Sequence, residues 1–372
     1  MLSVVPAHPQ NAQQSVQQNA VQDATPSATQ RIRASRFPLF DKPLLIGRHQ
    51  LANRVFIAPM AGVTDRPYRQ LCRGLGAGYA VSEMAASNAL LWATEKTSRR
   101  INHDGEPAPK AVQIAGGDAD LLAEAALFNA SRGADIIDIN MGCPAKKVCN
   151  KAAGSALMQN EKQVVEILRA VVKSLQGTNV PVTLKMRTGY SRSLRNAVQL
   201  ARIAEAEGIA MVIIHGRTRE DQYRGDAEYD TIAQVKSAVG IPVVANGDID
   251  SGPKALAVLK YTGADAVMIG RAAQGRPWLA GHVAHFLDSG EARPPPSLQE
   301  MSNWLRSHLL DHYAFYGELK GVRSARKHIG WYLQGLPGVR LFRETIFKAE
   351  TAEDQLAAID QFLLKQGLDC AA

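Results

Sequence analysis

The chain has 372 residues, of which 46% are hydrophobic, so it can build a core larger than that of one average domain. Its formal net charge of +8 favours a polyanionic partner, although an ordinary solvated surface can carry the same excess. The four cysteines have neither the density of a disulfide scaffold nor the spacing of zinc ligands, and no apolar run is long enough to span a bilayer. We therefore expect a cytoplasmic protein with reduced thiols, without a membrane partner or a metal, and with no need to be more than a monomer.

The N-terminal segment, residues 1–36, is rich in Gln, Ala, Asn and Ser. Asp23 is its only acidic residue, and the first aromatic residue of the chain is Phe37. A segment of this composition cannot bury enough apolar surface to order itself, so it is predicted to be a disordered polar extension. It also lacks the continuous apolar stretch of a cleaved signal.

From residue 54 onward, short apolar runs alternate with amphipathic stretches. The runs predict eight strands, at residues 55–60, 79–83, 111–114, 136–140, 181–186, 211–215, 242–245 and 266–269. The stretches between them predict helices at residues 65–75, 118–131, 161–174, 194–207, 230–239 and 252–261. This alternation favours an α/β fold of the (β/α)₈ TIM barrel type over residues 37–293. A doubly wound sheet is the alternative, but the early glycine-rich dinucleotide fingerprint is missing.

A proline run at residues 294–296 precedes a change in composition. Residues 298–316 have a helical pattern, and two further helical patterns follow. Residues 294–372 are therefore predicted to form a small all-helical C-terminal domain. Its charge excess is concentrated: Arg323, Arg326 and Lys327 fall at positions i, i+3 and i+4, which places them on one helical face.

The stretch from residue 135 to 158 joins a buried strand to a reactive group. The apolar run at 136–139 ends in Asn140, and Gly142, Cys143 and Pro144 follow directly. A second thiol, Cys149, lies in a loop with three lysines, Lys146, Lys147 and Lys151. A thiol and positive charge at the C-terminal end of a strand indicate a site for an anionic substrate.

The other strand ends carry polar groups too. In a barrel of this type the C-terminal ends of the strands form the active site. The residues just beyond the predicted strands are Pro59, Met60, Ala61, Glu83, Met84, Gln113, Asn140, Cys143, Lys185, Arg187, His215, Arg217, Asn246, Gly247, Asp248, Gly270 and Arg271. The glycines after the last two strands are placed to hold a phosphate through backbone N–H groups, as for a mononucleotide cofactor whose ring lies beside Gln113 and Lys185.

Several motifs make this pattern specific. They are IAPMAGVTDRPYR (57–69), NMGCPAKKV (140–148), LKMRTGY (184–190), IHGRTREDQYRG (214–225), VANGDI (244–249) and MIGRAAQGRPW (268–278). In sequence, order and spacing the chain resembles the tRNA-dihydrouridine synthases, and the segment KGVRSARKHIGWYL (320–333) is similar to the bacterial B type. The resemblance extends from about residue 37 to residue 362.

The resemblance implies an FMN enzyme that takes electrons from NADPH, with NADH as the alternative, and reduces the C5–C6 bond of uridine in tRNA. It further implies that the flavin gives a hydride to C6 and that Cys143 protonates C5. The residues that it assigns to FMN are Pro59, Met60, Ala61, Gln113, Lys185, His215, Asn246, Gly247, Asp248, Gly270 and Arg271. The tRNA would contact Lys146, Lys147, Lys151, Arg323, Arg326 and Lys327.

Taken singly, these residues also have simpler interpretations. A lone cysteine is more often a small buried residue than a catalyst, and three lysines in a loop usually form a solvated surface. Arg187 either lies near the flavin phosphate or pairs with Asp138 or Glu83. Two other functions stay open, namely a flavin barrel that reduces a free pyrimidine or another small enone, and a tRNA-binding factor in which chemistry is secondary.

Overall fold

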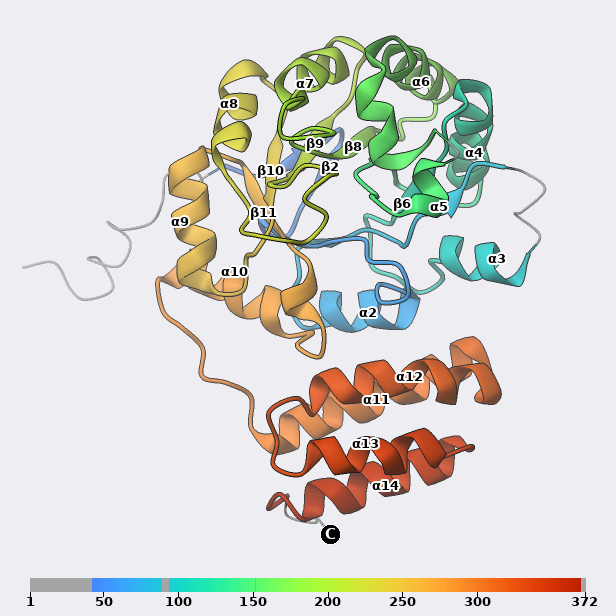
Figure 1. The fold of residues 1–372 in the computed structure, drawn as a ribbon, viewed down its shortest axis with the longest axis vertical. Coiled ribbons are helices and arrows are strands. Elements are labelled where there is room, and N and C mark those ends of the chain that lie inside the picture. Colours follow the sequence, from blue (N-terminus) through green and yellow to red (C-terminus); the bar gives the residue numbers. More distant parts are fainter. Residues whose placement is uncertain (1–41, 89–93, 151, 369–372) are drawn as a thin grey trace, which may run out of the picture. The chain divides into compact units, whose positions relative to one another are not determined.

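The computed structural model describes residues 42–88, 94–150 and 152–368 (Figure 1). The predicted disordered extension, residues 1–36, lies outside the described residues. Among the residues that are described, no helix combines the length and the apolar character of a membrane span.

A parallel sheet curls into a barrel at the centre of the fold. Its strands are β3 (Val55–Ile57), β4 (Tyr79–Ala80), β5 (Ala85–Ala86), β6 (Ala111–Ala115), β7 (Ile136–Met141), β8 (Val182–Arg187), β9 (Met211–His215), β10 (Val243–Asn246) and β11 (Ala266–Ile269). The pairing order is β4-β3-β11-β10-β9-β8-β7-β6-β5, and a parallel bridge between Val81 and Ala111 joins the β4 side to β6. The ring is thereby closed, which confirms the predicted (β/α)₈ barrel.

Helices surround this barrel, as Figure 1 shows for α4, α6, α7, α8 and α9. The bounds are α2 (Arg66–Gly74), α3 (Glu95–Ile101), α4 (Ala119–Ser131), α5 (Lys146–Cys149), α6 (Glu161–Ser174), α7 (Ala197–Ala206), α8 (Asp230–Ala238), α9 (Gly252–Thr262) and α10 (Leu279–Ser289), with 3₁₀ helices at Gly154–Gln159 and Arg271–Ala273. Asp65 caps the first of them, because its side chain accepts a hydrogen bond from Tyr68 N.

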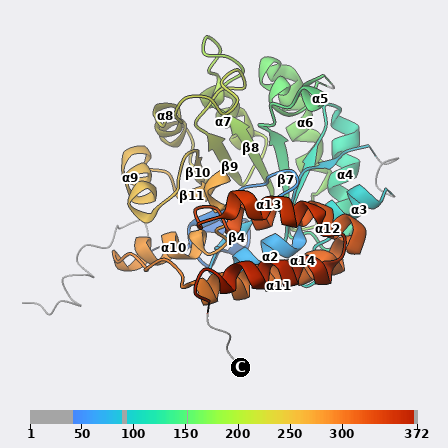
Figure 2. The ribbon, with the colours of Figure 1, turned by 60° about the horizontal axis from the view of Figure 1, so that its bottom comes forward.

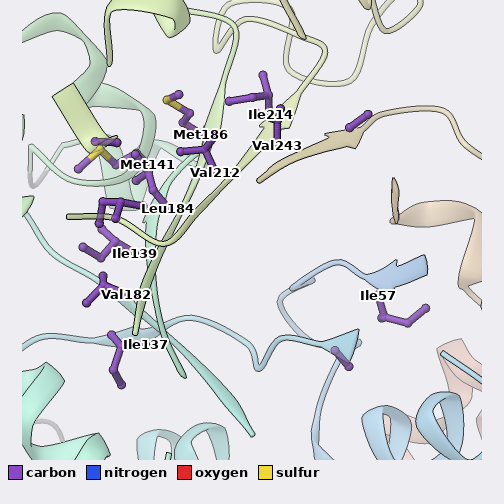
Figure 3. Close-up of a cluster of buried hydrophobic side chains, with 14 of the residues drawn as sticks. Ile57, Ile137, Ile139, Met141, Val182, Leu184, Met186, Val212, Ile214 and Val243 are labelled. Atoms are coloured by element: carbon purple, nitrogen blue, oxygen red, sulfur yellow. The ribbon is translucent and has the colours of Figure 1, made fainter. Parts of the chain in front are cut away.

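Alternation along the strands sorts residues into two cores. Ile137, Ile139 and Met141 of β7, with Val182, Leu184 and Met186 of β8, belong to the core between the strands and the helices (Figure 3). The residues between them point into the barrel. At the N-terminal ends of the strands these inner residues are apolar, among them Phe56, Ala111, Ile136, Met211, Val244 and Ala266, and they pack with Ile46 of an antiparallel hairpin, β1 (Leu45–Ile46) and β2 (His49–Gln50).

Toward the C-terminal ends the inner positions become polar. They include Gln113, Asp138, Asn140, Thr183, Lys185, His215 and Asn246. The register places Asn140 beside Lys185 and Asn246 beside His215, so strands far apart in sequence bring these side chains to one level of the barrel.

The second barrel strand differs from the prediction. A continuous strand was expected at 79–83, but β4 ends at Ala80, and only the isolated bridge at Val81 lies between it and β5. The cause is Ser82, whose side-chain oxygen accepts a hydrogen bond from Gln113 N at 3.0 Å where a backbone carbonyl would continue the ladder. The hairpin β1–β2 and the helices α3, α5 and α10 were not foreseen.

The C-terminal helices are α11 (Leu298–Tyr316), α12 (Glu318–Tyr332), α13 (Val339–Lys348) and α14 (Ala352–Leu364). Three helices thus follow α11, where two were predicted. They lie side by side (Figure 2) around a core of their own, formed by Leu305, Leu309, Ile329, Leu333, Ile346, Leu363 and others. A capping box at Ser297 and Glu300 begins α11, and this helix packs against α2 of the barrel part.

Candidate active site

Two adjoining cavities open at the C-terminal ends of the barrel strands. One has a volume of ≈ 600 Å³ and the other ≈ 450 Å³, a size typical of small-molecule sites. Six residues line both: Pro59, Met60, Lys185, His215, Tyr223 and Arg271. Cys143, Ala61 and Gln113 line the first alone, and Asn246, Gly247, Asp248 and Gly270 the second alone. The structure therefore brings Cys143 and every residue assigned to FMN to the same region.

A chain of buried hydrogen bonds fixes the backbone that carries Cys143. Thr183 Oγ1 donates to Asp138 Oδ1 at 2.6 Å, and Gln113 Nε2 donates to Asp138 Oδ2 at 2.7 Å. Asn140 Nδ2 then donates to Gln113 Oε1 at 2.8 Å. The side-chain oxygen of the same amide, Asn140 Oδ1, accepts from the N–H groups of Gly142 and Cys143, at 3.1 and 3.0 Å. The position of the thiol is therefore set from inside the barrel.

Arg187 supports the same loop from the other side. Its Nε donates to the carbonyl oxygen of Gly142 at 2.7 Å, and its Nη1 donates to the carbonyl oxygens of Thr218 and Gln222, both at 2.8 Å. Neither carboxylate that the sequence offered as its partner, Asp138 or Glu83, pairs with it. Glu83 instead accepts a hydrogen bond from Gly62 N and lies 3.8 Å from Arg100, so it braces the loop after β3.

The Cys143 thiol is half-buried on the wall of the larger cavity. Burial raises its pKa above the ordinary value, and a hydrogen bond involving the Ala145 backbone and the cations Arg187 and Lys185 oppose that rise. The thiol is thus protonated at neutral pH. The Cys149 thiol donates to the Cys143 carbonyl oxygen at 3.5 Å and contacts Ser155 Oγ at 3.6 Å, so it packs the loop, and the two cysteines are free.

Lys185 on β8 lines both cavities. Its Nζ donates to Asn246 Oδ1 at 3.0 Å, and Asn246 Nδ2 donates to the carbonyl oxygen of Met268 at 2.8 Å, which fixes the orientation of that amide. Burial, assisted by repulsion from Arg187, lowers the pKa of Lys185 to about 8. The lysine therefore still carries its charge at neutral pH, and an anionic group in the cavity would raise its pKa, so the lysine is suited to hold such a group.

His215 is surrounded by cations. Burial and the charges of Lys185, Arg187, Arg217 and Arg271 lower its pKa well below the ordinary value, so the ring is neutral. Arg217 Nη1 lies 3.4 Å from His215 Nε2. Because an arginine only donates, that nitrogen accepts, and the ring proton is on Nδ1. His215 therefore has a donor to offer at the cavity.

Arg217 also forms a forked ion pair with Asp248, at 2.9 Å from Nη1 to Oδ1 and 2.6 Å from Nη2 to Oδ2. Ala227 N and Arg271 Nη2 donate to the same carboxylate at 2.8 and 3.1 Å. Burial would raise the pKa of Asp248, but these hydrogen bonds lower it. With its carboxylate so occupied, Asp248 can offer a ligand only its backbone, whereas Arg271, half-exposed, keeps donors free.

The two glycines assigned to the phosphate differ in how much room they leave for a side chain. Gly247 has φ +130°, and a Cβ there would lie 2.6 Å from Ala227 Cβ, so glycine is required by the protein itself. A Cβ on Gly270, whose φ is −106°, would meet only Ala58 Cβ, at 3.9 Å. The space beside Gly270 belongs to the cavity, and a side chain would occupy it.

Sequence reasoning missed the roles of Arg217 and Tyr223. Arg217 is almost fully buried and ties β9 to the loop after β10, while Tyr223 lies under two guanidinium groups, those of Arg187 at 5.5 Å and Arg271 at 4.9 Å from the ring centre. Both belong to the segment 214–225. The only signal in the sequence was an arginine two residues after a histidine at a strand end. That spacing does not show which residue the arginine pairs with.

The residues assigned to RNA are only partly described. Lys151 lies outside the described residues, as do the side chains of Lys146 and Lys147 on α5. On α12, Arg323 and Lys327 are exposed, and a Cβ on Gly62 would lie 3.3 Å from Lys327 Nζ, so this lysine reaches the loop after β3 at the barrel mouth. Arg326 stacks on Phe347 at 5.3 Å and donates to the Ala349 carbonyl oxygen at 3.2 Å, which turns it toward α13.

A groove between α12 and α13 lies beside these charges. It has a volume of ≈ 480 Å³ and an apolar lining that includes Trp331, Leu333 and Phe342, with Arg323 and Arg343 among the basic residues around it. Tyr332 is buried in the core of the C-terminal helices, while Trp331 packs against the barrel core. Both aromatic residues thus serve packing.

Comparison with known proteins identifies the same family as the sequence motifs. A family described as dihydrouridine synthase matches residues 56–367. The chain is 56% identical over 321 residues to "tRNA-dihydrouridine synthase B" of Pseudomonas aeruginosa, an alignment that covers 86% of this chain and 96% of that protein. It is 58% identical over 312 residues to the protein of the same name from Xanthomonas axonopodis pv. citri, covering 84% and 93% of the two chains. Among solved structures, a 2-naphthoyl-CoA reductase complex is similar with a TM-score of 0.50 at 14% identity, over 65% of this chain and 51% of that one, a likeness of fold alone.

Proposed function

Because the chain belongs to the dihydrouridine synthase family, we propose that it reduces uridines in tRNA to 5,6-dihydrouridine, with FMN as cofactor and NADPH, or alternatively NADH, as reductant. The observation that carries the proposal is the Cys143 thiol, protonated and half-buried on the wall of a cavity whose other residues suit a flavin. Relatives more than half identical over most of their length bear the name of this activity.

The residues present fit FMN. The open space beside Gly270, the backbone of Gly247 and Asp248, and the free donors of Arg271 suit the phosphate. Gln113 and Lys185 line the adjoining cavity and would offer hydrogen bonds to the ring system, and Pro59, Met60 and Ala61 would form a wall beside it. When bound, the flavin supplies the hydride that the uracil ring receives at C6.

Cys143 supplies the other half of the reduction. Its Sγ gives a proton to C5 of the uracil, which completes the saturation of the C5–C6 bond and leaves a thiolate. Arg187 and Lys185 stabilise that thiolate, since both lower the pKa of the group, and the half-exposed sulfur regains a proton from solvent. A positioned acid contributes roughly 10²–10⁴-fold to such a step.

The test is Cys143→Ala, with Cys149→Ala as the matched control because that thiol contacts only the loop. We expect Cys143→Ala to retain bound FMN and its reduction by NADPH while dihydrouridine formation falls by roughly 10²–10⁴-fold. Cys149→Ala should keep both activities. Full dihydrouridine formation by Cys143→Ala would remove the acid role, and a purified protein that is colourless and takes up no FMN would remove the cofactor.

The region 294–372 is proposed as the tRNA-binding part, within an enzyme that works in the cytoplasm as a monomer. Arg323 and Lys327 are exposed, and Lys327 reaches the barrel mouth. Replacing both by Gln should raise the KM for tRNA, reduce the slope of log K against log salt by about 0.7–0.9 per lost phosphate contact, and leave flavin reduction unchanged. An unaltered KM and slope, or equal rates on free uracil and tRNA, would contradict this assignment.

A further inference from the structure

Four side chains with metal-binding chemistry meet outside the cavity just described. His308 and His312 are four residues apart on α11, so they project from one face of the helix, and His328 comes from α12. Their ligand nitrogens all lie within 4.8 Å of one another. Asp65, the residue that caps α2, lies 3.3 Å from His312, measured from Oδ2 to Nδ1. All four are almost completely buried.

This cluster concentrates the polar atoms that lack hydrogen bonds. Of the 14 buried side-chain N and O atoms without a partner in the described part of the chain, five are here: Asp65 Oδ2, His308 Nε2, His312 Nδ1, His328 Nδ1 and His328 Nε2. Each buried polar atom without a hydrogen bond costs roughly 1–3 kcal/mol of folding free energy. Five such atoms in one place therefore need an explanation, such as a bound ion.

The hydrogen bonds around His312 show which atom faces Asp65. Ser324 Oγ donates its proton to the Lys320 carbonyl oxygen at 2.7 Å, so it can only accept from His312 Nε2, also at 2.7 Å. In the neutral ring the proton is therefore on Nε2, and the lone pair of Nδ1 points at a carboxylate oxygen. Two acceptors at this distance repel each other unless a cation lies between them. That cation is either a proton on His312 or a metal ion.

Neighbouring groups form hydrogen bonds that orient the ligand side chains, as they do around most metal sites. Tyr332 Oη lies 3.4 Å from His308 Nδ1, which leaves Nε2 free, and Tyr68 N donates to Asp65 Oδ1 at 3.1 Å, which leaves Oδ2 free. The Tyr316 hydroxyl also donates a hydrogen bond to the Asp65 carboxylate.

We propose that Asp65, His308, His312 and His328 bind one Zn²⁺ ion in a closed, tetrahedral, structural site. Three imidazole nitrogens and a carboxylate oxygen are zinc ligands. The nitrogens lie within 4.8 Å of one another, and Asp65 Oδ2 lies 3.3 Å from His312 Nδ1. Zinc bonds of about 2.0–2.1 Å place ligand atoms about 3.3–3.4 Å apart, so ion binding draws the rings together and the carboxylate toward His308 and His328. Four protein ligands leave no open position for catalysis. The ion ties α11 and α12 to the cap of α2, directly after the loop that carries Pro59, Met60 and Ala61.

The experiment uses the full-length protein, stripped with a chelator and then incubated with Zn²⁺ or Co²⁺ alone. We expect about one equivalent of zinc per chain after desalting, a visible Co²⁺ spectrum of tetrahedral intensity without thiolate bands, and a melting temperature that rises on zinc addition. Asp65→Asn keeps the helix cap, because Asn caps as well as Asp, so it isolates the ligand role from folding. Its zinc affinity should fall by more than the roughly 10–100-fold that loss of an outer-shell partner costs.

Two control variants separate this site from others. His103→Gln alters a buried histidine elsewhere, which pairs with the Arg132 carbonyl oxygen, and Cys143→Ala removes the thiol of the other cavity. Both should bind zinc as the wild type does. The proposal is overturned if the wild-type protein takes up no zinc and no cobalt, which leaves the His312–Asp65 ion pair, or if Cys143→Ala alone abolishes binding. Unchanged zinc affinity in both Asp65→Asn and His328→Gln would equally overturn it.

Discussion

The glycines Gly247 and Gly270 allow the cofactor assignment to be tested apart from protein stability. In Gly270→Ala, the new methyl group meets only Ala58 Cβ, at 3.9 Å, so the free energy of unfolding should fall by less than it does in Gly247→Ala. The methyl group occupies the space assigned to the flavin phosphate. Overpacking of this kind costs roughly 1–3 kcal/mol, which predicts FMN binding weaker by about 5- to 150-fold.

Gly247→Ala is the counterpart. Its Cβ would lie 2.6 Å from Ala227 Cβ at a φ of +130°, so backbone strain of roughly 1–3 kcal/mol adds to overpacking of similar size. The loss of about 2–6 kcal/mol should appear in urea unfolding of flavin-depleted protein, where Gly270→Ala should lose less. FMN affinity is then measured by titration of the same preparations. If Gly270→Ala binds FMN as tightly as the wild type, the phosphate does not lie beside Gly270 and the assignment is wrong.

The other predictions concern the thiol and the arginines. Asn140→Ala removes the acceptor for two N–H groups and a donor to a buried amide, so it should lower the free energy of unfolding in urea by about 2–4 kcal/mol. It should also slow dihydrouridine formation without affecting flavin reduction. A rate of dihydrouridine formation equal to that of the wild type would refute the positioning role. Arg217→Met leaves Asp248 without its forked partner and should cost about 3–5 kcal/mol, whereas Arg271→Met, at a half-exposed pair, should cost at most about 1 kcal/mol; equal losses would contradict the distinction. Because burial raises the pKa of Cys143 above its ordinary 9.0, the active protonated thiol persists as the pH rises to 9, and the single-turnover rate of dihydrouridine formation should fall only above that value; a decline centred near pH 7 would exclude this assignment.

The barrel was predictable because each strand is an apolar run of the right length bounded by a helix. For β9 and β11 the predicted and observed bounds are the same, since the runs at 211–215 and 266–269 have sharp polar or glycine boundaries. The interruption of the second strand was not predictable, because it depends on Ser82 reaching a backbone N–H of a neighbouring strand. Local pattern carries no information about such a substitution in the ladder.

The location of the site was predictable for a related reason. In a parallel barrel all strands end at the same mouth, so the polar residues at those ends had to meet there. What each side chain does was harder to foresee. Asp248 was assigned to the cofactor, yet its carboxylate is held by Arg217, and Arg187 supports a loop rather than pairing with an acid. These partners are set by the curvature of the barrel and the shape of its loops.

The histidine cluster illustrates the limit of local reasoning. The four-residue spacing of His308 and His312 was visible, but the same spacing is common in amphipathic helices without a ligand. Its other members come from α12 and from the cap of α2, more than 240 residues earlier in the chain. Only the packing of α11 against α2 brings that carboxylate to the rings.

The chain of side chains from Thr183 through Asp138 and Gln113 to Asn140 has a consequence for engineering. Loops at the mouth of a barrel are usually treated as modules that can be exchanged on a constant scaffold. Here the loop that carries Cys143 takes its position from residues on β6, β7 and β8 deep in the barrel. A transplant of that loop into another barrel would therefore have to include the interior side chains of these three strands. Without them, the hydrogen bonds that set the position of the sulfur would be lost.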